Sequence, residues 1–242
     1  MNDKQVTIKT YERIGEAYHN KRINGKDMND LVEQPITFSL LGNIKNKKIL
    51  DAGCGSGIYT KLLAKKGGKV SALDLSKTML DIAKEYCKGY GIVFRRGSID
   101  NIPYKSNSFD IVVAPLVIHY LKNPEKAFNE FNRVLKKKGV LIFSTHNPLF
   151  VAKEGIWENK SFFEYLNEGK YEWYMHVNGK KEKMISYRIP YEKLFDMLYK
   201  NKFIVEKFKE PYLNKNKKIL KKHMKKYIGF PIFITLKCRK LD

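Results

Sequence analysis

Three glycines and two carboxylates lie around the end of one apolar segment. In ILDAGCGSGIYT, Gly53, Gly55 and Gly57 alternate with other residues and follow Asp51, and Asp74 ends the next apolar segment, KVSALD. Glycines between a strand and a helix let a ligand approach the backbone closely. A carboxylate at the end of the following strand can accept two hydrogen bonds from a ribose cis-diol. The spacing therefore predicts a nucleoside-binding site.

Two common phosphate-binding loops fit this segment less well. A Walker loop needs Lys followed by Ser or Thr after its last glycine, but Ile58 follows Gly57. A dinucleotide-binding loop would place its third glycine at position 58, so a nicotinamide dinucleotide is disfavoured. The carboxylate of Asp51 would repel a pyrophosphate. It can instead receive an ammonium group or fix the loop by accepting its backbone N–H groups.

The elements that must position these residues alternate along the chain. Apolar segments typical of strands lie at 47–54, 69–75, 92–98, 108–116 and 140–146, and helical patterns lie at 57–67, 77–91 and 124–139. Ser76 is the expected N-cap of the second of these helices. For the third, we expect Pro124 at the first helical position and Gly139 at its end. This order predicts an α/β fold with a parallel sheet, helices on both faces and all strand carboxyl ends at one edge.

The flanking segments predict further elements. Residues 1–42 contain a helix with Tyr11 and Tyr18 on one apolar face, and a second helix with Pro35 near its start or at a kink. Residues 148–190 interrupt the alternation and carry Asn178-Gly179, a strong signal for a type I′ hairpin. We interpret them as an insertion over the carboxyl edge of the sheet. A helix, a strand, a Lys-rich amphipathic helix at 214–230 and a last strand follow.

Length and composition suit one α/β domain. The chain has 242 residues and a net charge of +22, but most of its basic residues are Lys, so an AT-rich genome explains the charge better than a nucleic-acid partner does. The three cysteines form no CxxC pair, and neither a secretory signal nor an 18-residue apolar run is present. We therefore expect a cytoplasmic protein without a membrane span. The sequence does not predict its oligomeric state.

Together, these motifs resemble those of a known family. The ordered succession ILDAGCGSG, ALDLS, GSIDNIPYKSNSFDIVV and NEFNRVLKKKGVLIFS is similar to the class I S-adenosylmethionine-dependent methyltransferases, and most similar to their small-molecule branch with a type 11 methyltransferase domain. The resemblance implies a Rossmann-like, mostly parallel sheet of seven strands with a reversed final hairpin. It also implies S-adenosylmethionine as cofactor and S-adenosylhomocysteine as product, and we expect no metal site. Within a single domain over 1–242 we expect a helical cap (1–44), a cofactor-binding core (45–147), a substrate-side insertion (148–190) and a C-terminal helix with strands (191–242).

The resemblance also implies roles for individual residues. Gly53, Gly55 and Gly57 line the methionine and ribose parts of the cofactor, with Cys54 as a small residue among them. Asp51 supports the loop, Asp74 holds the ribose hydroxyls, and Leu75 and Ile99 flank the adenine. Ser98 stands where the family often has an Asp that contacts the adenine amino group. Ala114 and Pro115 form the wall beside the methyl donor, and Tyr11 and Tyr18 close over the cofactor or belong to an ordinary apolar stripe.

Two histidines are candidates for a catalytic base. His119 and His146 follow or end the fourth and fifth predicted strands, which places both near the carboxyl edge. A neutral histidine that packs in a wall or caps a helix is the alternative for either. Trp157, Trp173, Tyr174 and His176 can shape an acceptor pocket or simply pack in the insertion. Arg188 can bind an acidic acceptor or pair with a carboxylate.

The sequence predicts a methyltransferase that acts on an O or N atom of a small-molecule acceptor. Two alternatives stay open: an RNA methyltransferase that uses the basic surface, and a cofactor-binding protein without catalysis. The absence of an NPPY-type motif after the fourth strand, where APLV stands, argues against base methylation.

Overall fold

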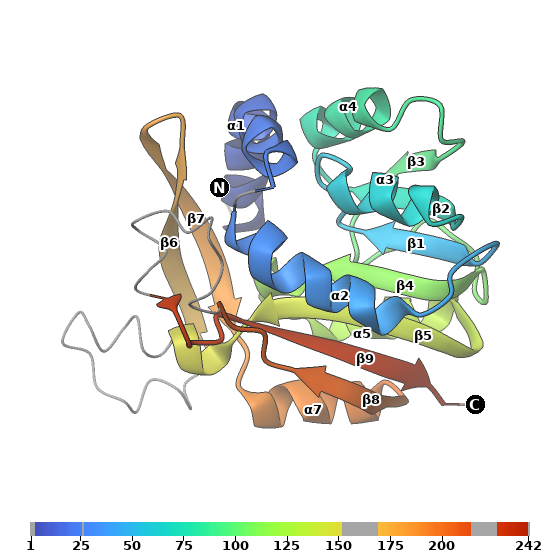
Figure 1. Cartoon of the computed structure of the whole chain (residues 1–242). Helices are drawn as coiled ribbons and strands as arrows, with labels where there is room; N and C mark the ends of the chain where they lie inside the picture. Colours follow the sequence, from blue (N-terminus) through green and yellow to red (C-terminus); the bar gives the residue numbers. More distant parts are fainter. Residues whose placement is uncertain (1–2, 26, 152–168, 214–226, 242) are drawn as a thin grey trace.

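The computed structural model describes residues 3–25, 27–151, 169–213 and 227–241. Its centre is a seven-stranded sheet in the order β3-β2-β1-β4-β5-β9-β8 (Figure 1). The strands are β1 (Lys48–Ala52), β2 (Lys69–Asp74), β3 (Val93–Arg96), β4 (Phe109–Pro115), β5 (Leu135–His146), β8 (Phe203–Lys209) and β9 (Phe233–Lys240). Strands β1 to β5 pair in parallel, and β9 runs antiparallel to both of its neighbours. The predicted α/β sheet with a reversed final hairpin is confirmed.

Helices cover both faces of this sheet, because the strands are apolar on both sides. Helices α5 (Glu125–Val134) and α7 (Tyr191–Lys200) pack on one face through fully buried side chains such as Phe128, Phe131 and Leu194. Helices α2 (Gln34–Leu41) and α3 (Ile58–Lys65) pack on the other face around Ile49 and Ile142. Helix α4 (Lys77–Tyr86) contacts β2 and β3. Burial of each large apolar side chain contributes about 1.5–3 kcal/mol.

A helix and a hairpin lie beyond the carboxyl ends of the parallel strands. Helix α1 (Asp3–Ile23) packs against α4 and against the hairpin of β6 (Gly169–Val177) and β7 (Lys180–Arg188) (Figure 1). Ile14 of α1 lies among the hairpin residues Met175 and Met184. The hairpin turns at Asn178 and Gly179, whose φ angles of 48° and 75° are those of the predicted type I′ turn.

Short helical segments connect these elements. A π-helix, η1 (Asn29–Glu33), leads directly into α2, and Pro35 lies in the first turn of α2, so it is near a helix start as predicted. A 3₁₀ turn, η2 (Ile118–Tyr120), follows β4. The predicted N-cap of α4 is confirmed, since the Ser76 hydroxyl accepts a hydrogen bond from the Met79 N–H at 3.3 Å.

The helix predicted at 124–139 is shorter than expected. It ends at Val134, with Pro124 as its N-cap instead of its first residue. Leu135 already pairs with Phe109 of β4, and Gly139 lies within β5 instead of ending the helix. Pairing with a distant strand therefore overrides the local helical preference of the lysine run. Trp157 and most of the predicted Lys-rich helix at 214–230 lie outside the described residues.

Candidate functional site

A cavity of about 1300 Å³ opens at the carboxyl edge of the sheet, bordered by α1, the glycine loop and the β6–β7 hairpin. Most of the predicted site residues line it: Tyr11, Tyr18, Gly53, Cys54, Gly55, Asp74, Leu75, Ser98, Ile99, Pro115, His119 and His146. Asp51, Gly57 and Ala114 do not line it. The topology thus brings together residues that are far apart in the sequence.

The glycine loop is shaped by left-handed backbone conformations. Gly53 has φ +80°, and a Cβ atom there would come within 2.5 Å of Val117 Cγ2. Gly55 has φ +52°, and a Cβ atom there would meet nothing within 4 Å. The first glycine is therefore required by packing, whereas the second leaves open space beside the backbone, as a loop that cradles a ligand does.

Asp74 holds this loop and still faces the cavity. Its Oδ2 accepts a hydrogen bond from the Gly55 N–H at 2.8 Å, and its Oδ1 accepts one from the Ser76 N–H at 2.9 Å. Burial raises the pKa of Asp74, and the backbone N–H groups of Ser76, Gly55 and Leu75 oppose that shift. Each carboxylate oxygen has a further lone pair, so the pair can also accept from two ribose hydroxyls. The residues present fit a nucleoside.

Asp51 lies behind the loop instead of in the cavity. Its side chain is fully buried, and its Oδ2 accepts a hydrogen bond from the Thr60 hydroxyl in α3. Burial, with a smaller contribution from the charge of Asp74, raises the pKa of Asp51 to about 7, although the hydrogen bonds from Thr60 oppose this shift. The contact with Thr60 anchors the strand end to α3.

Ser98 already has a partner at the predicted adenine end. Its Oγ accepts a hydrogen bond from Lys4 Nζ at 2.8 Å, and the same ammonium group forms an ion pair with Asp100 at 3.1 Å. Lys4 comes from α1, so this helix is tied to the loop after β3. No local sequence signal pointed to Lys4, because the contact spans 94 residues.

The two predicted histidines lie together on the other side of the cavity. Their rings stack with centroids 4.0 Å apart. His146 Nδ1 is hydrogen-bonded to the Tyr171 hydroxyl, and His119 Nδ1 lies 3.5 Å from the Thr145 hydroxyl. Burial lowers the pKa of His146 to about 4, and burial together with His146 lowers the pKa of His119 well below its ordinary value. Both imidazoles are therefore neutral at pH 7.

The hairpin contributes aromatic side chains to this part of the cavity. Trp173 lies edge-on to His146 with centroids 5.5 Å apart and donates to Ser186 Oγ at 2.9 Å. Tyr174 is 52% exposed, so its neighbour Trp173 is better placed than Tyr174 to shape an acceptor pocket. Tyr171 was not predicted. The period-2 alternation of Tyr171, Trp173 and Met175 on one face of β6 is the signal that could have indicated it.

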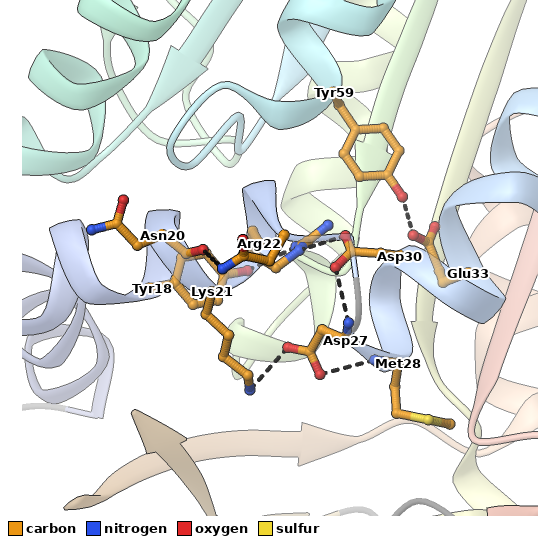
Figure 2. Close-up of polar contacts among 10 residues, drawn as sticks. Tyr18, Asn20, Lys21, Arg22, Asp27, Met28, Asp30, Glu33 and Tyr59 are labelled. Atoms are coloured by element: carbon orange, nitrogen blue, oxygen red, sulfur yellow. Dashed lines mark hydrogen bonds and ion pairs between the residues drawn. The ribbon is translucent and has the colours of Figure 1, made fainter. Parts of the chain in front are cut away.

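A polar network joins the end of α1 to η1 at the cavity (Figure 2). Arg22 Nε donates to Asp30 Oδ1 at 2.9 Å, and Arg22 Nη1 donates to the Tyr18 hydroxyl at 2.9 Å. Tyr18 also lies edge-on to Tyr11, whose hydroxyl is 2.8 Å from that of Tyr120. The two predicted tyrosines are thus held in place by partners outside the apolar stripe of α1.

Two kinds of feature are missing from the described residues. No group of three or more His, Cys, Asp or Glu side chains in these ranges could hold a metal ion. Within the same ranges, no helix has the length and apolar character needed to cross a membrane.

Comparisons with known proteins show what this chain is similar to. The family model described as "Methyltransferase domain" (Methyltransf_11) matches residues 50–143. An uncharacterized protein of Haemophilus influenzae is 30% identical over 226 residues, which cover 88% of this chain and 89% of that protein. A demethylmenaquinone methyltransferase of Tropheryma whipplei is 26% identical over 182 residues, covering 69% and 76%. The structure of a candidate S-adenosylmethionine-dependent methyltransferase from Listeria monocytogenes has a TM-score of 0.73 at 24% identity and covers 87% of this chain and 97% of that one.

The fold, the site and these similarities define one class of protein. The chain belongs to the class I S-adenosylmethionine-dependent methyltransferases, in the branch with a type 11 methyltransferase domain. Its cofactor is S-adenosylmethionine.

Proposed function

We propose that this methyltransferase transfers the methyl group to an O or N atom of a small-molecule acceptor. The observation that carries the proposal is a single cavity, which extends from the glycine loop and Asp74 to His119, His146 and Tyr171. Its volume of about 1300 Å³ exceeds the 300–1,000 Å³ typical of one ligand, so it has room for a cofactor and an acceptor together.

The part of the cavity beside the glycine loop and Asp74 suits the nucleoside. Gly53 and Gly55 would lie along its ribose and methionine parts, and Asp74 would accept hydrogen bonds from the ribose hydroxyls. Leu75 and Ile99 would flank the adenine, and Pro115 would form the wall beside the sulfur. When bound, the cofactor supplies a methyl group already activated by the sulfonium charge. The residues of this chain then need mainly to position the acceptor in line with it.

The part of the cavity beside His119, His146 and Tyr171 suits an acceptor that loses a proton. Neutral His146 can accept a proton at the ring nitrogen that does not contact Tyr171, provided that Nδ1–H donates to the Tyr171 hydroxyl. A pKa of about 4 makes His146 a weak base, so its main contribution would be to orient the O–H or N–H of the acceptor. The stacked ring of His119 would hold His146 in this orientation.

The proposed domain organisation gives each segment a task. Residues 1–44 would cap the cofactor, 45–147 would bind it, and 148–190 would cover the acceptor side, with 191–242 completing the sheet. The lining of the cavity by Tyr11 and Tyr18 from the first segment and by Tyr171 and Trp173 from the third supports this division. The reduced thiols support a cytoplasmic location.

Calorimetry followed by an acceptor screen tests the proposal. Wild-type protein should bind S-adenosylhomocysteine, and Asp74→Ala should lose at least about 10-fold in affinity, since it removes charged acceptors for two hydrogen bonds. Asp81→Ala, a change at an exposed carboxylate of α4, is the matched control and should bind as wild type does. Labelled methyl groups should then enter the small-molecule fraction of a metabolite extract. Labelling of the RNA fraction alone, or of neither fraction, would contradict the proposal.

A further inference from the structure

Arg188 places a buried positive charge in the acceptor part of the cavity. Its residue is 9% exposed and lines the cavity together with Tyr171. Burial raises the pKa of Tyr171, and the charge of Arg188 opposes that rise, so the two side chains are close neighbours. Tyr171 is in turn hydrogen-bonded to neutral His146. A guanidinium stays charged in proteins and carries five N–H donors, so it can bind an anionic ligand besides any protein group that it contacts.

The register of the β6–β7 hairpin places Arg188 on the face that carries Tyr171 and Trp173. Gly169 pairs directly with Arg188, and Tyr171 pairs directly with Ser186. Directly opposite residues share a face of the hairpin, as do alternate residues along each strand, and Trp173 Nε1 donates to Ser186 Oγ on this face at 2.9 Å. Gly169 lines the cavity, and a Cβ atom added there would meet no described atom within 4 Å. The register therefore leaves space for a ligand group beside the guanidinium.

The acids in the described lining of the cavity are bound to other groups. Asp74 accepts hydrogen bonds at the glycine loop, and Glu172, which alternation places on the opposite face of β6 from Tyr171, forms an ion pair with Lys183 at 2.6 Å. The other lysines and arginines of this lining form ion pairs with acids, which are Lys4–Asp100, Lys21–Asp27, Arg22–Asp30 and Lys170–Asp3. The charge of Arg188 therefore makes the acceptor part of the cavity favourable for an anionic group.

We propose that Arg188 binds a carboxylate of the methyl acceptor, which is a small carboxylic acid with a separate O–H or N–H group. This rests on the proposed function. One guanidinium matches a monoanionic carboxylate in charge and in its paired donors, whereas a phosphate dianion calls for more cations. The bound carboxylate is a poor nucleophile because Arg188 neutralises it, so it holds the acceptor and is not itself methylated. The acceptor O or N atom gains the methyl carbon and loses its proton to water, while the electron pair of the broken carbon–sulfur bond stays on sulfur.

A metabolite extract divided by anion exchange at pH 7 is the probe. The retained pool holds anionic metabolites, and the unretained pool holds neutral and cationic ones. With methyl-labelled S-adenosylmethionine, wild-type protein should label the retained pool about 10-fold faster than the unretained pool, or more. Prior phosphatase treatment should leave this labelling unchanged, and the product should resist mild alkali, which cleaves methyl esters. Equal or faster labelling of the unretained pool, loss of labelling after phosphatase, or an alkali-labile product would overturn the proposal. Labelling of neither pool would instead overturn the proposed function.

Variants of Arg188 test the residue itself. Arg188→Gln removes the charge, and Arg188→Lys keeps the charge without the planar pair of donors. Lys180→Gln, at the exposed start of β7, is the matched control. The amount of retained pool that gives half-maximal labelling should rise about 10- to 100-fold in Arg188→Gln, about 3- to 10-fold in Arg188→Lys and not at all in Lys180→Gln.

Calorimetry with S-adenosylhomocysteine separates acceptor binding from a structural role of Arg188. The affinity should be unchanged in all three variants, because the glycine loop and Asp74 are intact. If Arg188→Gln does not fold, Arg188→Lys gives the same test. An unchanged half-maximal amount of pool in the folded Arg188 variants, or an equal loss of S-adenosylhomocysteine affinity, would overturn the assignment.

Discussion

Replacement of Gly55 by alanine is the most direct test of what the open space beside the loop is for. The Gly55→Ala variant would keep the backbone N–H that donates to Asp74, and its new Cβ would meet no protein atom within 4 Å. The change therefore adds a methyl group only to the space that we assign to the ligand. An alanine at φ +52° costs about 1–2 kcal/mol of stability from its left-handed backbone.

Gly91 offers a matched control. It is exposed, has φ +64°, and a Cβ atom there would also meet nothing within 4 Å. Both Gly55→Ala and Gly91→Ala should lower the melting temperature by about 2–8 °C for a chain of this size. Only Gly55→Ala should also weaken S-adenosylhomocysteine binding in calorimetry, by about 10-fold or more, since an extra methyl in a packed contact costs about 1–3 kcal/mol.

The comparison of the two variants shows whether the ligand approaches Gly55. If Gly55→Ala binds S-adenosylhomocysteine within about twofold of wild type while its melting temperature falls as much as that of Gly91→Ala, the ligand does not approach Gly55. The assignment of the glycine loop to the cofactor would then be refuted. If Gly91→Ala loses affinity equally, backbone strain and not contact explains the loss.

Three further predictions concern Gly53, Asp51 and His146. Gly53→Ala should destabilise the protein by about 2–5 kcal/mol, because strain adds to the clash with Val117, and adding Val117→Ala should restore part of this loss in urea unfolding. Because the pKa of Asp51 is raised in the folded protein, its contribution to folding stability is present below pH 3.8 and is lost as pH rises through about 7. Asp51→Asn should therefore have a free energy of unfolding higher than that of wild type above pH 7, by on the order of 4 kcal/mol. The same dependence of unfolding free energy on pH in both proteins would contradict this. The lowered pKa of His146 has the opposite effect, since its contribution to folding stability is present above pH 6.5 and is lost as pH falls through about 4. In His146→Gln, the melting temperature should therefore depend less on pH between 6.5 and 4 than in wild type.

Local patterns predicted the elements that depend on neighbouring residues. The Ser76 cap and the Asn178-Gly179 turn each follow from a few adjacent residues, and both are found as expected. The end of α5 could not be predicted in this way, because Leu135 leaves the helix to pair with Phe109, which is distant in sequence. Helical preference in the lysine run is worth a few tenths of a kcal/mol per residue, and sheet pairing readily exceeds it.

The residues of the candidate site also differ in whether neighbouring or distant parts of the chain determine their contacts. The sequence could predict that Asp74 lies beside the glycine loop, because both follow adjacent strands, and Gly55 N–H does donate to Asp74. Lys4 and Tyr171 could not be predicted, because they meet Ser98 and His146 only after the chain has folded. Arg22 was not predicted because arginines near the end of a helix are mostly solvated and stabilise its negative end. Its burial depends on partners in both α1 and η1, and neither its own side-chain type nor its position reveals them.

The position of β9 in the sheet has a consequence for how the protein is made. This strand follows all the others in the chain, yet it lies between β5 and β8 and contributes the fully buried Ile234, Leu236 and Cys238. During synthesis, β5 would present an open edge, and β8 would have no strand to join until β9 has left the ribosome. The five parallel strands can assemble earlier. Closure of the sheet is therefore a late step, and the nascent chain must keep the edge of β5 free from other partners until then.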